Sequence, residues 1–248
     1  MAHIILTGAT GTAGSAILAH CLTSSAIARI SILSRRPVAL AQNQPKAQVL
    51  ICENFESYSQ STLAQLKGAT ACIWAQGISS AGMGEQEYVK ITVDYPVAAA
   101  RAFADLTGEA KGGEDAKMNF VYLSGEGAST TEDSYAMFGR IKGRAENKLI
   151  SLSSELQNLR VFCVRPALIN PEGNYLAERK IGMLARFSSG MGALLERSWK
   201  AGVISTEALA RVCVDLTLGD GEAVPVGRGV EMEGRVLRNT ALRRLAGL

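Results

Sequence analysis

The chain has 248 residues, of which 47% are hydrophobic and 20% are charged, a composition typical of a folded globular protein with one sizeable core. Its formal net charge is only +3, and the basic residues form no continuous block. This distribution argues against a nucleic-acid-binding protein, which usually concentrates its basic residues on one face.

Short apolar segments alternate with longer segments of helical periodicity, a pattern typical of βαβ units and a parallel sheet. The predicted strands cover residues 3–6, 29–33, 48–52, 71–74, 119–123 and 160–164. The predicted helices cover residues 13–22, 59–66, 85–105, 134–152, 176–195 and 206–218. Residues 108–117 are polar and rich in glycine, so we expect a surface loop there.

This alternation predicts an α/β protein with a doubly wound parallel Rossmann-like sheet and helices on both faces. We expect a single NAD(P)-binding domain over residues 1–248. Within it, residues 1–166 form the cofactor-binding core. Residues 167–248 form a smaller C-terminal part that covers the open edge of the sheet and shapes the substrate pocket.

The segment between the first predicted strand and the first predicted helix, residues 7–14, reads TGATGTAG. Its glycines, Gly8, Gly11 and Gly14, permit a tight turn and a close approach of the backbone to a pyrophosphate. The amides at the helix start then face the anion, and the helix dipole favours it. We therefore expect a dinucleotide site here, and the alternative is a glycine turn that binds no ligand. The further cofactor contacts expected in this turn are Thr7, Thr10 and Thr12.

The residues that follow the second predicted strand indicate which dinucleotide is bound. NAD-binding domains usually place a carboxylate there to hold the ribose 2′-hydroxyl. This chain has Ser34, Arg35 and Arg36 instead. Two guanidiniums can pair with a 2′-phosphate and stack on adenine, so we expect NADP(H) as the cofactor. The alternative is a pair of surface arginines in a turn.

Three segments carry a resemblance to a known group of proteins. TGATGTAG at residues 7–14, SRRP at 34–37 and KGRAE at 142–146 resemble the atypical short-chain dehydrogenase/reductase superfamily. The nearest branches are NAD(P)-binding proteins similar to the HIV Tat-interacting-protein group and small fungal oxidoreductases of polyketide pathways. The resemblance covers residues 3 to about 170. It implies a seven-stranded Rossmann-like sheet, with the cofactor across the C-terminal ends of the strands.

The resemblance also implies roles for individual residues. Ser124, after the fifth predicted strand, matches the catalytic serine, and Lys142 matches the lysine that holds the ribose hydroxyls. Pro166 matches the stretch that contacts the cofactor carboxamide. The remaining expected cofactor contacts are Asn54, Ala75, Gln76 and Gly77.

One position departs from the pattern of this superfamily. The usual general acid is a tyrosine four residues before the lysine, and here that residue is Phe138, whose phenyl ring has no proton to donate. Tyr135 is the substitute that we expect to face the same pocket. It lies three residues earlier, however, which on a helix is about 4.5 Å of rise and about 60° of rotation away. Tyr122 is a poorer candidate.

Two of these assignments have a structural alternative. Lys142 could be an exposed helical lysine paired with Glu146 four residues later. Ser124 could satisfy local backbone groups at the end of its strand.

The rest of the composition excludes several kinds of site and indicates where the protein works. The two histidines and five scattered cysteines lack zinc-ligand spacing, so we expect neither a metal site nor a Ser-His-Asp triad. No apolar stretch approaches the length of a membrane span, and no signal peptide is visible. We expect a cytoplasmic protein whose partner is a small-molecule substrate and neither a nucleic acid nor a membrane. The oligomeric state stays open, with a homodimer as the candidate.

Two functions remain open at this point. The first is an NADP(H)-dependent oxidoreductase acting on a small carbonyl compound, of aromatic or polyketide type, with Ser124, Tyr135 or a bound water managing the proton. The second is an NADP(H)-binding protein without redox turnover: a sensor, a scaffold or a non-redox isomerase. Phe138 favours the second function, because its phenyl ring cannot donate a proton and the fold alone does not fix activity.

Overall fold

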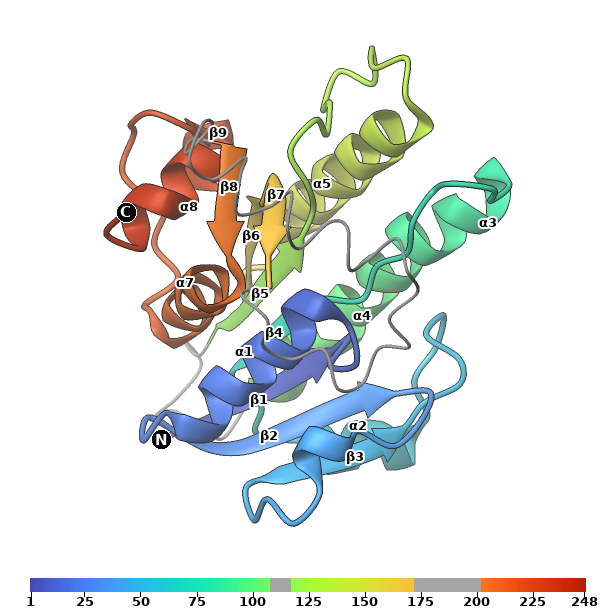
Figure 1. The fold of residues 1–248 in the computed structure, drawn as a ribbon. Helices are drawn as coiled ribbons and strands as arrows, with labels where there is room; N and C mark the ends of the chain where they lie inside the picture. Colours follow the sequence, from blue (N-terminus) through green and yellow to red (C-terminus); the bar gives the residue numbers. More distant parts are fainter. Residues whose placement is uncertain (108–116, 172–201) are drawn as a thin grey trace.

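A computed structural model of the chain describes residues 1–107, 117–171 and 202–248. It contains an eight-stranded sheet in the order β3-β2-β1-β4-β5-β6-β10-β9 (Figure 1). Every strand runs parallel to its neighbours except β9, which is antiparallel to β10. The expected doubly wound α/β fold is therefore confirmed, with the antiparallel strand β9 added to the seven strands that the resemblance implied.

The sheet strands are β1 (Ala2–Thr7), β2 (Ile27–Ser34), β3 (Ala47–Ile51), β4 (Ala71–Trp74), β5 (Met118–Leu123), β6 (Leu159–Arg165), β9 (Val230–Glu231) and β10 (Val236–Arg238). A separate two-stranded parallel sheet pairs β7 (Leu168–Asn170) with β8 (Val203–Ser205). The α-helices are α1 (Thr12–Thr23), α2 (Gln60–Leu66), α3 (Glu85–Val89), α4 (Tyr95–Phe103), α5 (Met137–Glu155), α7 (Thr206–Leu218) and α8 (Asn239–Leu245).

Both faces of the sheet are covered by helices, because the central strands are apolar on both sides. In β1, Ile4 and Leu6 join the core cluster with helices α1, α7 and α8, whereas Ile5 between them joins the cluster with α2 to α5. This period of two is that of a strand whose alternate side chains face opposite sides. A hydrophobic core therefore covers each face of the sheet, and a binding site can form at the ends of the strands.

The single helix predicted over residues 85–105 is interrupted in the structure. A wider π-helical turn, Lys90–Asp94, lies between helix α3 and helix α4. A 3₁₀ turn, Ala104–Thr107, follows helix α4. Pro96 has no N–H to donate to the carbonyl of Thr92, four residues earlier. The Tyr122 hydroxyl donates to that carbonyl instead, at 3.1 Å. The interruption thus follows from a proline whose missing hydrogen bond is supplied by β5.

Other boundaries shift by a few residues. The helix predicted from residue 134 begins at Met137, so Tyr135 lies before the helix and not on it. Ser59 is the N-cap of α2, where its side chain accepts a hydrogen bond from the Thr62 amide. The helix predicted over residues 176–195, and all but the last residue of the loop predicted over 108–117, lie outside the described residues.

The C-terminal part of the chain contributes directly to the fold. Helix α7 packs against α1, and β10 pairs with β6 at what would otherwise be the open edge of the sheet. Among the described residues, no helix has the length and apolar character needed to span a membrane. The described ranges also contain no group of His, Cys, Asp or Glu side chains arranged to hold a metal ion.

Candidate functional site

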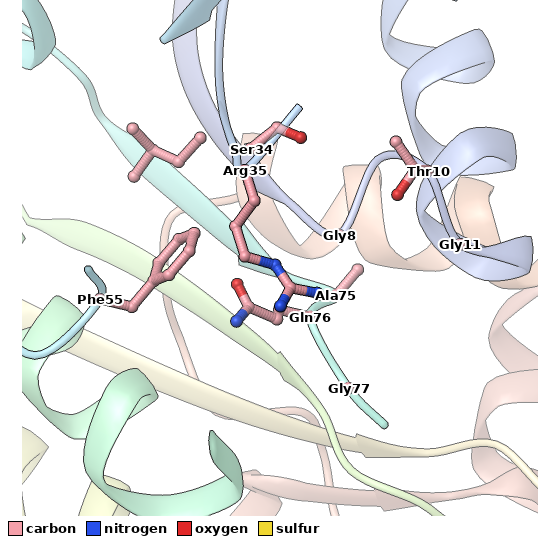
Figure 2. Close-up of a pocket in the computed structure, with 10 residues that line it drawn as sticks. Gly8, Thr10, Gly11, Ser34, Arg35, Phe55, Ala75, Gln76 and Gly77 are labelled. Carbon is pink, nitrogen blue, oxygen red and sulfur yellow. The ribbon is translucent and has the colours of Figure 1, made fainter. Parts of the chain in front are cut away.

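A pocket lies at the carboxyl ends of β1, β2 and β4, beside the glycine turn (Figure 2). The parallel strands bring these ends to one edge of the sheet, which is where ligands bind in open α/β folds. Its lining residues are Gly8, Thr10, Gly11, Leu33, Ser34, Arg35, Phe55, Ala75, Gln76 and Gly77. All of them except Leu33 and Phe55 were predicted from the sequence as cofactor contacts.

The three glycines of the turn have different structural roles. Gly8 adopts a φ of +68°, and a Cβ there would lie 2.3 Å from the Ala75 carbonyl oxygen. A Cβ at Gly14 would lie 2.0 Å from the Gly8 carbonyl oxygen, so Gly14 permits the helix to pack on the turn. A Cβ at Gly11 would meet only that same oxygen, at 3.3 Å, and Gly11 also lines the pocket. At Gly11, therefore, a side chain would enter the pocket more than it would collide with the backbone.

Two threonines predicted as cofactor contacts are not among the pocket-lining residues. Thr7 is fully buried, and its hydroxyl accepts a hydrogen bond from the Gln76 amide at 3.2 Å. This bond ties the end of β1 to the segment after β4, so Thr7 shapes the pocket from behind. Thr12 is the first residue of α1, and its carbonyl accepts a hydrogen bond from the Ser15 hydroxyl.

The two arginines after β2 lie differently. Figure 2 shows Arg35 extending from the end of β2 toward Gln76 and Ala75, so its guanidinium lies over the pocket. Arg36 is exposed and is not a lining residue, while its amide donates to the Ser34 hydroxyl at 3.3 Å. The structure therefore brings Arg35, and not Arg36, to the site that the sequence assigned to both.

One wall of the pocket is apolar and is formed by Phe55, which the sequence did not predict. Phe55 is only 2% exposed and meets Trp74 edge-to-face, with ring centroids 5.9 Å apart. Its neighbour Asn54, which was predicted to contact the cofactor, uses its side-chain oxygen to accept from the Glu56 amide at 2.8 Å. An aromatic residue just after the third strand was the available signal for this wall.

A second group of predicted residues lies at the ends of β5 and α5. Ser124 is 9% exposed, and its Oγ has no hydrogen-bond partner among the described residues. Lys142 is 7% exposed, its Nζ donates to the Leu123 carbonyl at 2.9 Å, and it lies 5.0 Å from the centre of the Tyr122 ring. The alternative of an exposed Lys142 is wrong, and the Ser124 hydroxyl, which follows its acceptor Leu123 in the chain, is buried without a hydrogen-bond partner among the described residues.

Burial changes the proton affinity of this lysine. Removal from water lowers the pKa of Lys142 from 10.5 to about 8, and the nearby Glu146 carboxylate opposes part of that shift. The side chain is therefore charged at neutral pH but close to its titration range.

Replacing Lys142 with methionine is expected to stabilise the protein near neutral pH by up to about 3 kcal/mol, the cost that corresponds to its lowered pKa. Between about 8 and 10.5 the unfolded chain binds more protons than the folded chain, so wild-type stability from this group rises with pH there. Urea unfolding of both proteins near pH 7 and near pH 10 measures the effect. A stability difference that does not shrink at the higher pH would contradict a buried, charged Lys142.

Phe138 and Tyr135 occupy opposite environments. The ring of Phe138 points at Gly125, where a Cβ would lie 2.8 Å from the ring's Cζ atom. Position 138 therefore faces the residue that follows Ser124. Tyr135 is fully exposed ahead of α5, and the structure does not bring its side chain together with Ser124 and Lys142.

Comparisons with known proteins place the chain in a family. It is 34% identical to "Leucinostatins biosynthesis cluster protein T" of Purpureocillium lilacinum, over 97% of this chain and 94% of that protein. The chain belongs to the family of protein T. It is also 29% identical to "Protein fmp52, mitochondrial" of Aspergillus clavatus, over 92% of each chain. No family model matches it.

Solved structures of other proteins share the fold of this chain. The chain matches 3-oxoacyl-[acyl-carrier protein] reductase from Brucella melitensis, in complex with NAD, with a TM-score of 0.68 and 14% identity, over 100% of this chain and 98% of that one. Vestitone reductase from alfalfa matches with a TM-score of 0.62, 17% identity, and coverage of 92% and 75%. The fold implied by the resemblance to the short-chain dehydrogenase/reductase superfamily is thereby confirmed.

In this member of the protein T family, a chain of ion pairs joins the loop after Ser124 to helix α5. Buried Glu146 accepts from Arg165 Nε at 2.9 Å, and Arg165 Nη1 donates to Glu231 at 2.9 Å. Arg238 lies 3.6 Å from Glu231 and donates from Nε to Glu126 at 2.8 Å. The ion-pair chain thus links both strands of the β9–β10 hairpin to the two segments that carry Ser124 and Lys142.

The loop after Ser124 is also fastened by backbone groups. Glu126 accepts from the Asn239 amide at 3.1 Å, and its own amide donates to the Pro166 carbonyl at 2.9 Å. Pro166 is buried, and its observed role is to accept this bond. The predicted carboxamide contact of Pro166 stays a prediction.

Proposed function

We propose that this chain is an NADP(H)-dependent oxidoreductase that acts on a small carbonyl compound of aromatic or polyketide type. The observation that carries the proposal is the placement of Arg35 over a pocket that begins at the glycine turn. The name of protein T, which refers to a fungal biosynthesis cluster, and the reductases of the same fold support it. NADPH consumption with a panel of aromatic ketones and quinones tests it.

The described residues fit a dinucleotide. Gly11, the N-cap of α1, has no side chain to occupy the amides of the first helical turn, which suits them to a pyrophosphate. A Cβ at Gly8 or Gly14 would collide with backbone, so the turn holds a shape that only glycine permits. In this proposal Arg35 pairs with the 2′-phosphate and Phe55 lies beside the adenosine end.

The chemistry is then divided between the cofactor and the chain. A bound nicotinamide supplies or accepts the hydride. We assign the proton to the Ser124 hydroxyl, because it has no hydrogen-bond partner among the described residues and directly precedes Gly125, which Phe138 faces. Lys142 contributes a buried positive charge that favours negative charge developing on the substrate oxygen. Tyr135 is the second candidate, and its exposure counts against it.

A second function rests on one observation, the phenyl ring at position 138 beside Gly125. A chain without the usual phenol could bind NADP(H) as a sensor, scaffold or non-redox isomerase. NADPH binding with no consumption against every carbonyl in the panel would establish this function and exclude the first.

Replacing Arg35 with alanine is expected to weaken NADPH binding by about 1.5–3 kcal/mol, the range for a hydrogen bond to a charged group. NADH binding should change little, because NADH has no 2′-phosphate. Arg36→Ala is the matched control and is expected to retain NADPH affinity, because Arg36 does not line the pocket. Fluorescence titration of both cofactors measures this, and equal NADPH affinity in the wild type and Arg35→Ala would overturn the NADP assignment.

Three further expectations are part of the proposal. We propose that residues 1–166 bind the cofactor while residues 167–248 shape the substrate pocket, that the protein acts in the cytoplasm, and that it forms a homodimer. The names of the fmp52 relatives, which include the word mitochondrial, make localisation by fluorescent fusion the direct test of the second. Sedimentation equilibrium tests the third.

A further inference from the structure

A second cavity lies at the opposite end of the sheet from the glycine turn. It is bounded by the end of α5, the start of β6 and the residues that precede β10. Because β6 begins at Leu159, this is the amino edge of the sheet, whereas the glycine turn follows the carboxyl end of β1. Its volume of about 370 Å³ falls in the range of about 300–1,000 Å³ that is usual for small-molecule sites.

Two arginine side chains line this cavity, and each is held in place by the fold. Arg235 stacks over the Phe162 ring at 5.0 Å, and its Nη1 donates to the Gly221 carbonyl at 2.8 Å. Arg160 uses its Nη1 to donate to two carbonyls of its own turn, at 3.0 and 2.9 Å. Both guanidiniums are therefore positioned before any ligand arrives.

The positive charge of Arg235 is offset only in part by its surroundings. Burial, and then the charge of Arg160, lowers the pKa of Arg235 below its ordinary value, and the Glu222 carboxylate opposes part of that shift. Glu222 and Glu233 also line the cavity, but in the described part of the chain neither forms an ion pair with these guanidiniums. Because Arg160 affects Arg235 more strongly than Glu222 does, the pair favours an anionic ligand.

The donors that remain suit one kind of ligand group. A guanidinium has five N–H donors in a planar fork, and the bonds that Arg160 and Arg235 make within the described residues use only their Nη1 atoms. The Nε and Nη2 edge matches two oxygens of a carboxylate or phosphate. We propose that this cavity binds a small organic molecule through a carboxylate or phosphate group held by Arg160 and Arg235.

The rim of the cavity has an uncommon backbone. Met232 and Glu233, which are adjacent and both line the cavity, have φ angles of 47° and 54°. Non-glycine residues rarely adopt this left-handed conformation, and they keep it where the surrounding structure requires it. Here it places two large side chains, one apolar and one acidic, in the lining of the cavity.

The test uses the full chain with inorganic phosphate and citrate as probes of the two oxyanions. Phenylglyoxal modifies arginine side chains, and peptide mass spectrometry reads the modification at Arg160 and Arg235. We expect saturable protection of both by at least one probe, and the probe that protects at the lower concentration identifies the oxyanion. Arg35→Ala is the control, because phosphate could also enter the glycine-turn pocket, and protection should persist in it. Protection by neither probe, or its loss in Arg35→Ala, overturns the proposal.

A misfolded variant would lose binding, so a substitution that is expected to strengthen binding separates the proposal from misfolding. Glu233→Gln removes a negative charge from the rim and is expected to lower the midpoint of protection about two- to fivefold. Arg235→Gln is expected to abolish protection at Arg160. A midpoint that stays the same or rises in Glu233→Gln would contradict an anionic ligand in this cavity.

Discussion

Phe138→Tyr is expected to raise carbonyl-reductase activity by about 10²–10⁴-fold, the usual contribution of a positioned general acid. The new hydroxyl would extend from Cζ into the space that the absent side chain of Gly125 leaves open. Gly125 directly follows Ser124, whose Oγ has no partner in the described structure, so we expect the two hydroxyls to form a hydrogen bond. The buried Lys142 ammonium nearby would lower the phenol's pKa.

The measurement is NADPH consumption against aromatic ketones and quinones by the wild type, Phe138→Tyr, Tyr135→Phe and Lys142→Ala. Tyr135→Phe is the matched control, because it removes a hydroxyl that the structure places in solvent, and we expect no effect. A wild type that turns over and is inactivated by Tyr135→Phe would make Tyr135 the displaced acid. If every variant binds NADPH and none oxidises it, the redox proposal fails and the binding function replaces it.

Gly11→Val is expected to abolish dinucleotide binding while the protein stays folded. Its Cβ would meet only the Gly8 carbonyl oxygen, at 3.3 Å, which is tight for the fold but tolerable, whereas the branched methyls would enter the pocket. Gly14→Val is expected to unfold the chain instead, because its Cβ would lie 2.0 Å from that oxygen. Cofactor titration and circular dichroism separate the two outcomes.

Gly84→Ala is the control for substituting a glycine in this chain. It precedes α3, and a Cβ there would meet nothing within 4 Å, so binding and folding should both be retained. Cofactor binding that persists in a folded Gly11→Val would show that the pyrophosphate does not lie at this turn.

The sequence predicts those parts of the site that depend on a single stretch of chain. The glycine turn, Ser34 and Arg35 follow directly from strand ends and from spacing. Gly8, Thr10, Gly11, Ser34 and Arg35 line the pocket, and their contact with a cofactor stays a prediction. Phe55 was missed because its place in the wall depends on packing against Trp74, a β4 residue distant in the sequence. Arg36 was assigned to the pocket because the sequence does not show which of two adjacent side chains turns inward.

The sequence also does not show which charged side chains are buried or which partners they take. The spacing of Lys142 and Glu146 suited a surface pair, but Arg165 from β6 takes the carboxylate, and Lys142 turns to the Leu123 carbonyl. Strands β9 and β10 are too short to show a period of two, so they were not predicted. The interruption before α4 had a visible cause in Pro96, which a helix prediction over residues 85–105 passed over.

The pairing of β10 with β6 has a consequence for shortened forms of the chain. A protein that ended before Val230 would present the backbone N–H and C=O groups of β6 as an open edge, on which a strand from another molecule can add. It would also lose Glu231, one of the two carboxylates that neutralise Arg165, whose side chain is only 6% exposed. Such a protein would retain the glycine turn and Arg35 and yet self-associate. We therefore expect loss of the C-terminal strands to expose the β6 edge without altering the glycine turn near the N-terminus.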